Sequence, residues 1–360
     1  MKQFLGYSSI RVYAILISII IGSFCKSSFA VIEPVFMNTG PKPSSAASSR
    51  QIVRKAPQSA VVLGGVPKSK WTYGCAATAA GMVFGYYDRN GYSDIYTGPR
   101  NGGVVPLRNL GNTTALIASK KGRDRNRSFG HVNDYWRAYG RSGPDPYETA
   151  GRAEHTPNCV ADFLGTNQWK WDYNYSDGKI DFNVDGSTAL WAYSSGEKLY
   201  DFIPSESAGL PQTSFCHGLK LYAEHCGYSV LENYTQRVDV DGGFSYLDYQ
   251  SEIDAGRPVF IQLAGHSMVG VGYDPDSEII YIHDTWDNRL HWMQWGESYA
   301  GMQHLAVTVL NLDSSSIGYL WNDSETLLNS LAIASPEPGS VSIILFGGLI
   351  ILLRRRGSKD

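Results

Sequence analysis

Residues 71–91 read WTYGCAATAAGMVFGYYDRNG, and this stretch predicts a helix that opens on a cysteine. The alanines after Cys75 are strong helix formers, and the apolar residues from Met82 onward continue the pattern. The turn-forming pair Asn90-Gly91 predicts the end of the helix. Cys75 is therefore expected at or just inside a helix N-terminus, where unpaired N–H groups and the helix dipole favour the nucleophilic thiolate. A buried structural cysteine is the alternative, because free cysteines are among the most buried residues.

The composition narrows the class of protein. The chain has 360 residues and a formal net charge of -3, and no long run of lysine and arginine interrupts its central part. We therefore expect no nucleic-acid partner. Tyrosine, glycine and tryptophan are plentiful, which is typical of an exported protein rich in loops and strands.

The first thirty residues have the three parts of a signal peptide. Lys2 and Arg11 give a positive start, residues 14–22 form an apolar run, and residues 28–30 (SFA) form a small-x-small cleavage site. This predicts export of the chain and processing by a signal peptidase. An uncleaved membrane helix is the alternative, although the apolar run is shorter than a membrane span requires.

The last residues, 335–360, have the pattern of a second targeting segment. A Pro-Glu-Pro tripeptide at 336–338 precedes an apolar run over 341–353 and three arginines at 354–356. As a helix the apolar run would reach about 20 Å, short for a membrane core of about 30 Å. The arginines would stay on the cytoplasmic side, with the bulk of the chain outside.

This three-part end resembles the PEP-CTERM sorting signal, which consists of the tripeptide, a hydrophobic helix and a basic tail. The resemblance implies an exosortase as partner and handling at the cell envelope of a Gram-negative bacterium that makes exopolysaccharide. It also implies a transient membrane anchor through the C-terminal helix. A plain tail anchor is the alternative.

Between these ends the chain divides by composition. Residues 31–60 are rich in serine, proline and alanine and predict a flexible linker, and residues 314–334 predict a second linker. Residues 61–313 are expected to form one domain that opens on a short strand or turn over 61–67. Helices are predicted over 215–225 and 244–255, and strands over 258–264, 266–273, 278–283 and 305–310. Helices first and an antiparallel sheet second indicate an α+β fold.

Residues 169–187 are dense in aspartate, asparagine and glycine. Their spacing is faintly like that of a calcium loop, but Gly178 stands one place late and no glutamate follows at the twelfth position. Surface turns between short strands are predicted instead. No histidine or cysteine pair has the spacing of a zinc site, so no metal and no cofactor is expected.

His266 and Asp284 are the residues that would complete a site around the predicted thiol. If a four-residue hairpin loop follows Tyr273, that residue pairs with Glu278 and His266 falls opposite Thr285, beside Asp284. The carboxylate would then orient one imidazole nitrogen, leaving the other to face the thiol, as in a covalent catalyst. The offset of one residue requires a β-bulge or the end of the strand at Asp284.

Three sequence segments resemble the papain-like cysteine peptidases. They are Tyr73-Gly74-Cys75 opening a helix, GHSMVGVGY at 265–273 and IHDTW at 282–286. The resemblance is closest to the branch related to the bacteriocin-leader-processing peptidases. It covers residues 61–313, with a long insert between the first two segments.

The resemblance implies a fold and a reaction. The N-terminal helical part would carry the cysteine and the C-terminal antiparallel sheet the histidine and aspartate. The expected substrate is a peptide or protein, cut at an amide bond through an acyl-enzyme. Cys75 would be the nucleophile, His266 the general base and acid, and Asp284 the orienting carboxylate.

One position departs from the family pattern. Six residues before the cysteine the family has an oxyanion-stabilising glutamine, and this chain has Ser69. The main-chain N–H of Cys75 remains one donor, and Ser69, Thr72 and Tyr73 are the candidates for the second. Losing one such donor costs about 3 kcal/mol of transition-state stabilisation. Two alternatives therefore stay open: a weak or inactive scaffold that binds the cell surface or exopolysaccharide matrix, and an enzyme that uses the same triad for acyl transfer.

The remaining cysteines of the mature chain predict a disulfide. Cys216 and Cys226 bracket a predicted helix and would lie about 15 Å apart, beyond the roughly 7 Å that a disulfide allows. Cys159 is therefore expected to pair with one of them in an exported protein. Three reduced, buried thiols are the alternative.

Overall fold

The computed structural model describes residues 31–37, 51–53, 56–71, 74–93, 95, 107, 157, 159–166, 170–174, 179–183, 188–203, 214–314, 343–346 and 349–352. The chain divides into two compact units, Met1–Leu312 and Asp313–Asp360. The predicted signal peptide lies outside the described residues, as do residues 315–334 of the predicted second linker.

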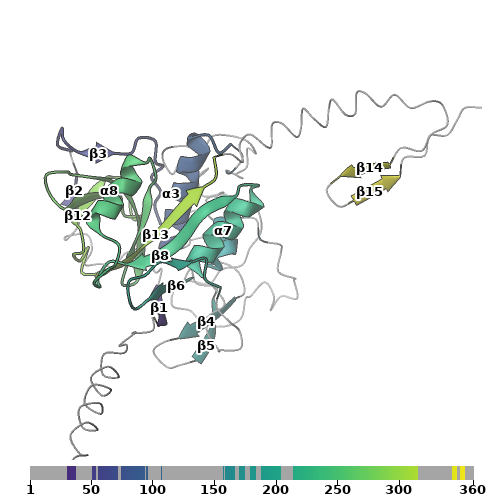
Figure 1. Cartoon of the computed structure of the whole chain (residues 1–360), viewed down its shortest axis with the longest axis horizontal. Helices are drawn as coiled ribbons and strands as arrows, with labels where there is room; N and C mark the ends of the chain where they lie inside the picture. The colour runs from purple at the N-terminus through teal and green to yellow at the C-terminus, as the bar shows by residue number, and fades with distance from the viewer. Residues whose placement is uncertain are drawn as a thin grey trace, which may run out of the picture. The chain divides into compact units, whose positions relative to one another are not determined.

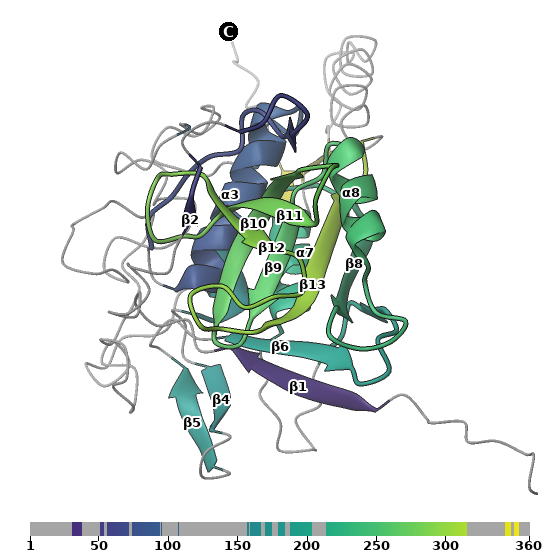
Figure 2. The same cartoon turned by 90° about the vertical axis from the view of Figure 1, so that its left-hand side faces the viewer.

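A nine-stranded sheet forms the centre of the first unit (Figures 1 and 2). Its hydrogen-bonded order is β2-β12-β11-β10-β9-β13-β8-β7, with β3 on β10, and each of these pairings is antiparallel. The strands are β2 (Gln51–Ile52), β3 (Val61–Val62), β7 (Leu199–Tyr200), β8 (Val230–Arg237), β9 (Val259–Leu263), β10 (His266–Tyr273), β11 (Ile279–His283), β12 (His291–Gln294) and β13 (His304–Leu312). The predicted strands over 258–264, 266–273, 278–283 and 305–310 are confirmed as β9, β10, β11 and β13.

The described helices of this unit are α3 (Cys75–Arg89), α6 (Val160–Leu164), α7 (Phe215–His225) and α8 (Tyr246–Asp254). The helix expected over 215–225 is confirmed, and the one expected over 244–255 starts two residues later. With the antiparallel sheet, these helices confirm the α+β fold class.

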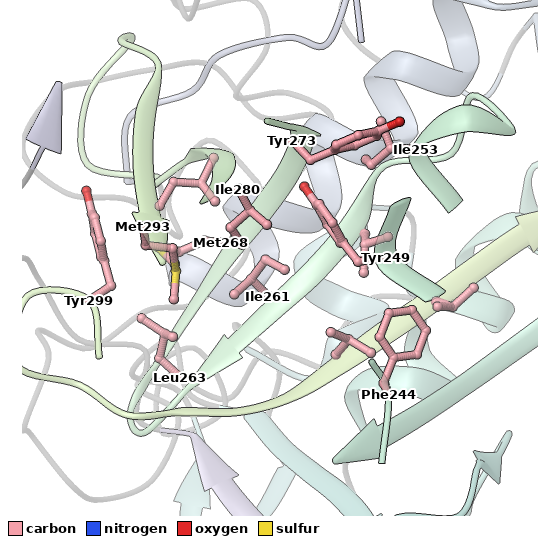
Figure 3. Close-up of a cluster of buried hydrophobic side chains, with 14 of the residues drawn as sticks. Phe244, Tyr249, Ile253, Ile261, Leu263, Met268, Tyr273, Ile280, Met293 and Tyr299 are labelled. Atoms are coloured by element: carbon pink, nitrogen blue, oxygen red, sulfur yellow. The ribbon is translucent and has the colours of Figure 1, made fainter. Parts of the chain in front are cut away.

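Alternate residues of β9 face opposite sides of the sheet, as in any strand. Ile261 belongs to a buried cluster with Tyr249 of α8, drawn in Figure 3. Phe260 instead meets Phe215 of α7, with 5.1 Å between the ring centroids. α8 therefore packs on one face of the sheet and α7 on the other.

Shorter strands form two further ladders. β1 (Ile32–Met37) pairs with β6 (Thr188–Tyr193), and β4 (Lys170–Asn174) pairs with β5 (Lys179–Asn183), each antiparallel. The second ladder is the pair of short strands expected within 169–187. The first ladder and β2 correct the prediction of a flexible linker over 31–60. The stretch IEPVFM at 32–37 supplies strand-forming residues that the overall Ser/Pro-rich composition concealed.

The second unit contains a hairpin of β14 (Ile343–Phe346) and β15 (Leu349–Leu352). This corrects the hydrophobic helix predicted over 341–353. Isoleucine is β-branched and favours strands, and the Gly347-Gly348 pair between the two apolar runs is typical of a hairpin turn. Among the described residues, no helix has both the length and the apolar content to cross a membrane.

Candidate functional site

Cys75 is the first residue of α3, where the sequence predicted it. Gly74 precedes it as the N-cap with φ 102° and ψ 139°, a conformation that side chains other than glycine's resist. The hydroxyl and the main-chain N–H of Thr78 both donate to the carbonyl of Gly74, at 2.7 and 3.1 Å. This first turn fixes the direction in which Cys75 leaves the backbone.

Two tyrosines of α3 anchor the helix to the sheet region. The Tyr86 hydroxyl donates to the carbonyl of Gly256 at 2.8 Å, and the Tyr87 hydroxyl donates to the carbonyl of Leu310 in β13 at 2.6 Å. Residues 75–88 are all buried, and the alanine-rich first turns allow a close approach to the strands. Cys75 therefore lies in a packed helix with little freedom of movement.

The N-terminus of α3 meets the start of β10. The main-chain N–H of Ser267 donates to the Cys75 sulfur at 3.2 Å, so the thiol contacts the residue next to His266. Within the described part of the chain, no hydrogen bond joins this thiol to the His266 ring. The exposed fractions of Cys75 and His266 are 0% and 1%. Two segments 192 positions apart in the sequence thus meet in one buried place.

Asp284 directly follows the end of β11, and the β10–β11 register corrects the predicted one. Tyr273 pairs with Ile280 and not with Glu278, because the connecting loop is longer, with the Asp274 N–H bonded to the carbonyl of Ile279 at 3.0 Å. A bulge interrupts the ladder between Gly270 and Gly272. A bulge in β10 and the end of β11 at His283 are therefore both present, but the ladder pairs Val269 with His283 and does not place Asp284 opposite His266.

The hydrogen bond between His266 and Asp284 runs to the main chain. Nε2 of His266 donates to the Asp284 carbonyl oxygen at 2.9 Å, and the Thr285 hydroxyl oxygen lies 3.5 Å from the same nitrogen. The indole of Trp286 stacks on the imidazole with 4.1 Å between ring centroids. The ring of His266 is therefore oriented by the 284–286 turn.

The Asp284 carboxylate faces other partners. One oxygen accepts from the main-chain N–H of Trp286 at 3.1 Å, and the other accepts from the Tyr299 hydroxyl at 3.0 Å. Nε2 of His291 lies 3.4 Å from the second oxygen. Sequence reasoning missed Tyr299 and gave His291 no role, because neither has a motif or spacing that connects it to Asp284.

Burial controls the ionisation of the thiol and the imidazole. It raises the pKa of Cys75 to about 12, although hydrogen bonds from Ser267 and Ala76 act in the opposite direction. It lowers the pKa of His266 to about 4, against the bond to the Asp284 carbonyl and the charge of that residue. The thiolate expected at the helix N-terminus is thus corrected to a neutral thiol in this arrangement, because desolvation outweighs the main-chain donors.

The oxyanion candidates are placed in part. Ser69 is buried, and its main-chain N–H donates to the thioether sulfur of Met82 at 3.3 Å. Met82 is two turns along α3 from Cys75, and the main-chain N–H of Ser69 is thus already engaged by that side chain. Thr72 and Tyr73 lie outside the described residues.

The predicted disulfide of Cys159 with Cys216 or Cys226 is not formed in the structure, where none of the three cysteines is disulfide-bonded. Cys216 donates to the side-chain oxygen of Asn233 at 3.1 Å, and Cys226 lies 3.7 Å from the carbonyl of Ile95. The two thiols stand at opposite ends of a continuous α7, which agrees with the argument that they do not bond to each other.

Asp284, Asp287 and His291 are a group whose possible metal-ligand atoms all lie within 4.8 Å of one another. Nε2 of His291 lies 3.0 Å from one oxygen of Asp287 and 3.4 Å from one oxygen of Asp284. A single imidazole N–H shared by the two carboxylates accounts for the grouping. Sequence reasoning expected no metal and did not connect these three residues.

Comparison with known proteins gives one family. The model of the Peptidase_C39 like family matches residues 184–307, about a third of the chain. The match includes His266 and Asp284, begins after Cys75 and does not cover that residue. No curated protein and no solved structure matches the chain. The family match and the antiparallel sheet with its few helices support a C39-type, papain-like peptidase domain.

Proposed function

We propose that the chain is a cysteine peptidase that hydrolyses amide bonds with Cys75 as nucleophile, His266 as general base and acid, and Asp284 as orienting residue. The observation that carries the proposal is the 3.2 Å contact of the Cys75 sulfur with the N–H of Ser267, which brings the helix N-terminus to the histidine strand. The family match over residues 184–307 supports a peptide or protein as substrate.

In the proposed reaction the imidazole of His266 removes the thiol proton of Cys75, and the sulfur attacks the peptide carbonyl carbon. The imidazolium then returns this proton to the leaving amine as the C–N bond breaks, which leaves a thioester. Water, deprotonated by the same imidazole, attacks the thioester and releases the carboxylic acid and the free thiol. The main-chain N–H of Cys75 would be one oxyanion donor.

The experiment compares the parent protein and Cys75→Ala on a randomised fluorogenic peptide library. We expect hydrolysis by the parent and none above background by the variant, since the variant lacks the attacking sulfur. Equal hydrolysis by both would end the proposal. An added amine separates hydrolysis from acyl transfer, because a transferase would form the amide product.

A binding protein on an inactive scaffold is the second candidate. The raised pKa of Cys75 and the serine at the position of the oxyanion glutamine favour it. Alkylation with iodoacetamide at pH 6 is a one-sided test of the candidates. Labelling of Cys75 at that pH favours the peptidase, because a thiol with an ordinary pKa of about 8.5 or above scarcely reacts. Absence of labelling favours neither candidate, because Cys75 is completely buried.

We further propose that the chain is exported and sorted to the cell envelope, with signal peptidase and an exosortase as partners. The support is the three-part N-terminus and the Pro-Glu-Pro, apolar and arginine order of the C-terminus. Mass spectrometry of the protein from the envelope fraction of an exosortase-bearing host tests this. The expected mature chain begins at Val31 and lacks the final arginines; an intact chain in the cytoplasm would contradict it.

A further inference from the structure

The Asp284 turn contains a strained residue at the point where it meets His266. Thr285 has φ 61°, in the left-handed region, and is completely buried. A β-branched residue is strained in this conformation, so surrounding contacts must hold it. The turn directs the carbonyl of Asp284, its preceding residue, onto Nε2 of His266.

The contacts that hold the turn are made by the Asp284 carboxylate. Its bond from the Trp286 N–H closes the turn over Thr285, and its bond from the Tyr299 hydroxyl ties the turn to another segment. Tyr299 is itself fixed, because its N–H and carbonyl pair with those of Met302 at 2.9 and 3.0 Å. Its ring is 3% exposed and belongs to the cluster of Figure 3, where it lies at one end.

We infer that Tyr299 is a positioning residue for the base of the proposed peptidase. By holding the Asp284 carboxylate it keeps the left-handed turn closed, and the closed turn places the main-chain carbonyl of Asp284 on Nε2 of His266. A carbonyl oxygen only accepts, so Nε2 carries the ring hydrogen and Nδ1 keeps the lone pair that a general base needs. This inference rests on the proposed function for its kinetic consequence, but its structural consequence is the tautomer of His266.

The first test is the tautomer itself, measured by ¹⁵N-histidine NMR in a Cys75→Ala background that needs no activity. The imidazole of His266 in the parent should be in the Nε2–H form. Tyr299→Phe removes only the phenolic hydroxyl that holds the Asp284 carboxylate. The turn should then no longer keep the Asp284 carbonyl on Nε2, and a mixture of tautomers is expected. Tyr222→Phe is the matched control, because its buried hydroxyl donates to the carbonyl of Ile95 and not to Asp284. An unchanged His266 tautomer in Tyr299→Phe overturns the inference.

The second test is kinetic. Tyr299→Phe should lower kcat by about 10- to 100-fold with KM within about twofold, because a slightly misplaced base slows the chemical step. In an Asp284→Ala background the same change should have no further effect, since Tyr299 acts through that carboxylate. Additive losses, or an equal loss in Tyr222→Phe, would contradict the role. If the parent is inactive, the proposed function fails and the NMR result alone decides the inference.

Discussion

At the scale of single residues, Gly74 determines the backbone conformation directly before Cys75. Its φ of 102° is open to glycine and strained for any residue with a Cβ. We expect Gly74→Ala to lower the free energy of unfolding by about 1–3 kcal/mol and to reduce peptide hydrolysis, because the first turn of α3 shifts with Cys75. Urea unfolding and kinetics measure both effects.

Gly64→Ala is the matched control for that change. A Cβ built on Gly64 meets nothing within 4 Å, so this variant should unfold like the parent. Equal stability of the two variants would show that the conformation of Gly74 imposes no strain.

The sequence predicted the position of Cys75 at a helix start but not its ionisation. Helix propensity and the Asn90-Gly91 turn are local, and they located α3 correctly. The pKa of Cys75 depends on the complete burial of its sulfur, which arises from strands almost two hundred residues later. A local pattern contains no information on that desolvation.

At the scale of elements, the bulge in β10 is stabilised by one tyrosine of α8. The Tyr249 hydroxyl donates to the carbonyl of Gly272 at 2.9 Å and accepts from the N–H of the same residue at 3.2 Å. Tyr249→Phe would leave a buried donor and a buried acceptor without this partner. We expect a loss of about 1–3 kcal/mol in the free energy of unfolding, measured by urea titration.

The control is Tyr200→Phe, whose side chain is 54% exposed in β7. This substitution should change stability by less than about 0.5 kcal/mol. If both tyrosine variants unfold at the same urea concentration, the hydroxyl of Tyr249 does not support the bulge.

Strands β9, β10, β11 and β13 were predictable because their runs are apolar and β-branched. The β10–β11 register was not, since it depends on a bulge that α8 supports and on a loop longer than the assumed four residues. The C-terminal apolar run forms a strand pair and not the predicted helix, because its β-branched isoleucines favour strands and Gly347-Gly348 is a sequence typical of hairpin turns.

At the scale of the whole molecule, buried histidines make the free energy of unfolding depend on pH. Burial lowers the pKa of His266 and His304 to about 4 and that of His283 to about 3. In the unfolded chain each has a pKa of about 6.5. Between about pH 6.5 and 4 the unfolded state therefore binds protons that the folded state does not, and stability falls as the pH falls.

Above about pH 7.5 we expect these three histidines to contribute almost no pH dependence to the free energy of unfolding. Below about pH 6.5 it should fall by up to about 1.4 kcal/mol per pH unit for each histidine. Urea titrations at several pH values measure the slope, and His304→Gln should make it shallower. An identical unfolding midpoint at pH 7.5 and pH 5 would refute the prediction.

The 0% exposure of the Cys75 sulfur also limits how any molecule reaches it. A peptide or an alkylating reagent meets the thiol only after a local opening of the protein, so access and chemistry occur in sequence. At high reagent concentration the modification rate then stops rising and equals the rate of opening. The observed reactivity of Cys75 therefore depends on the frequency of local opening as well as on the chemical reactivity of its thiol.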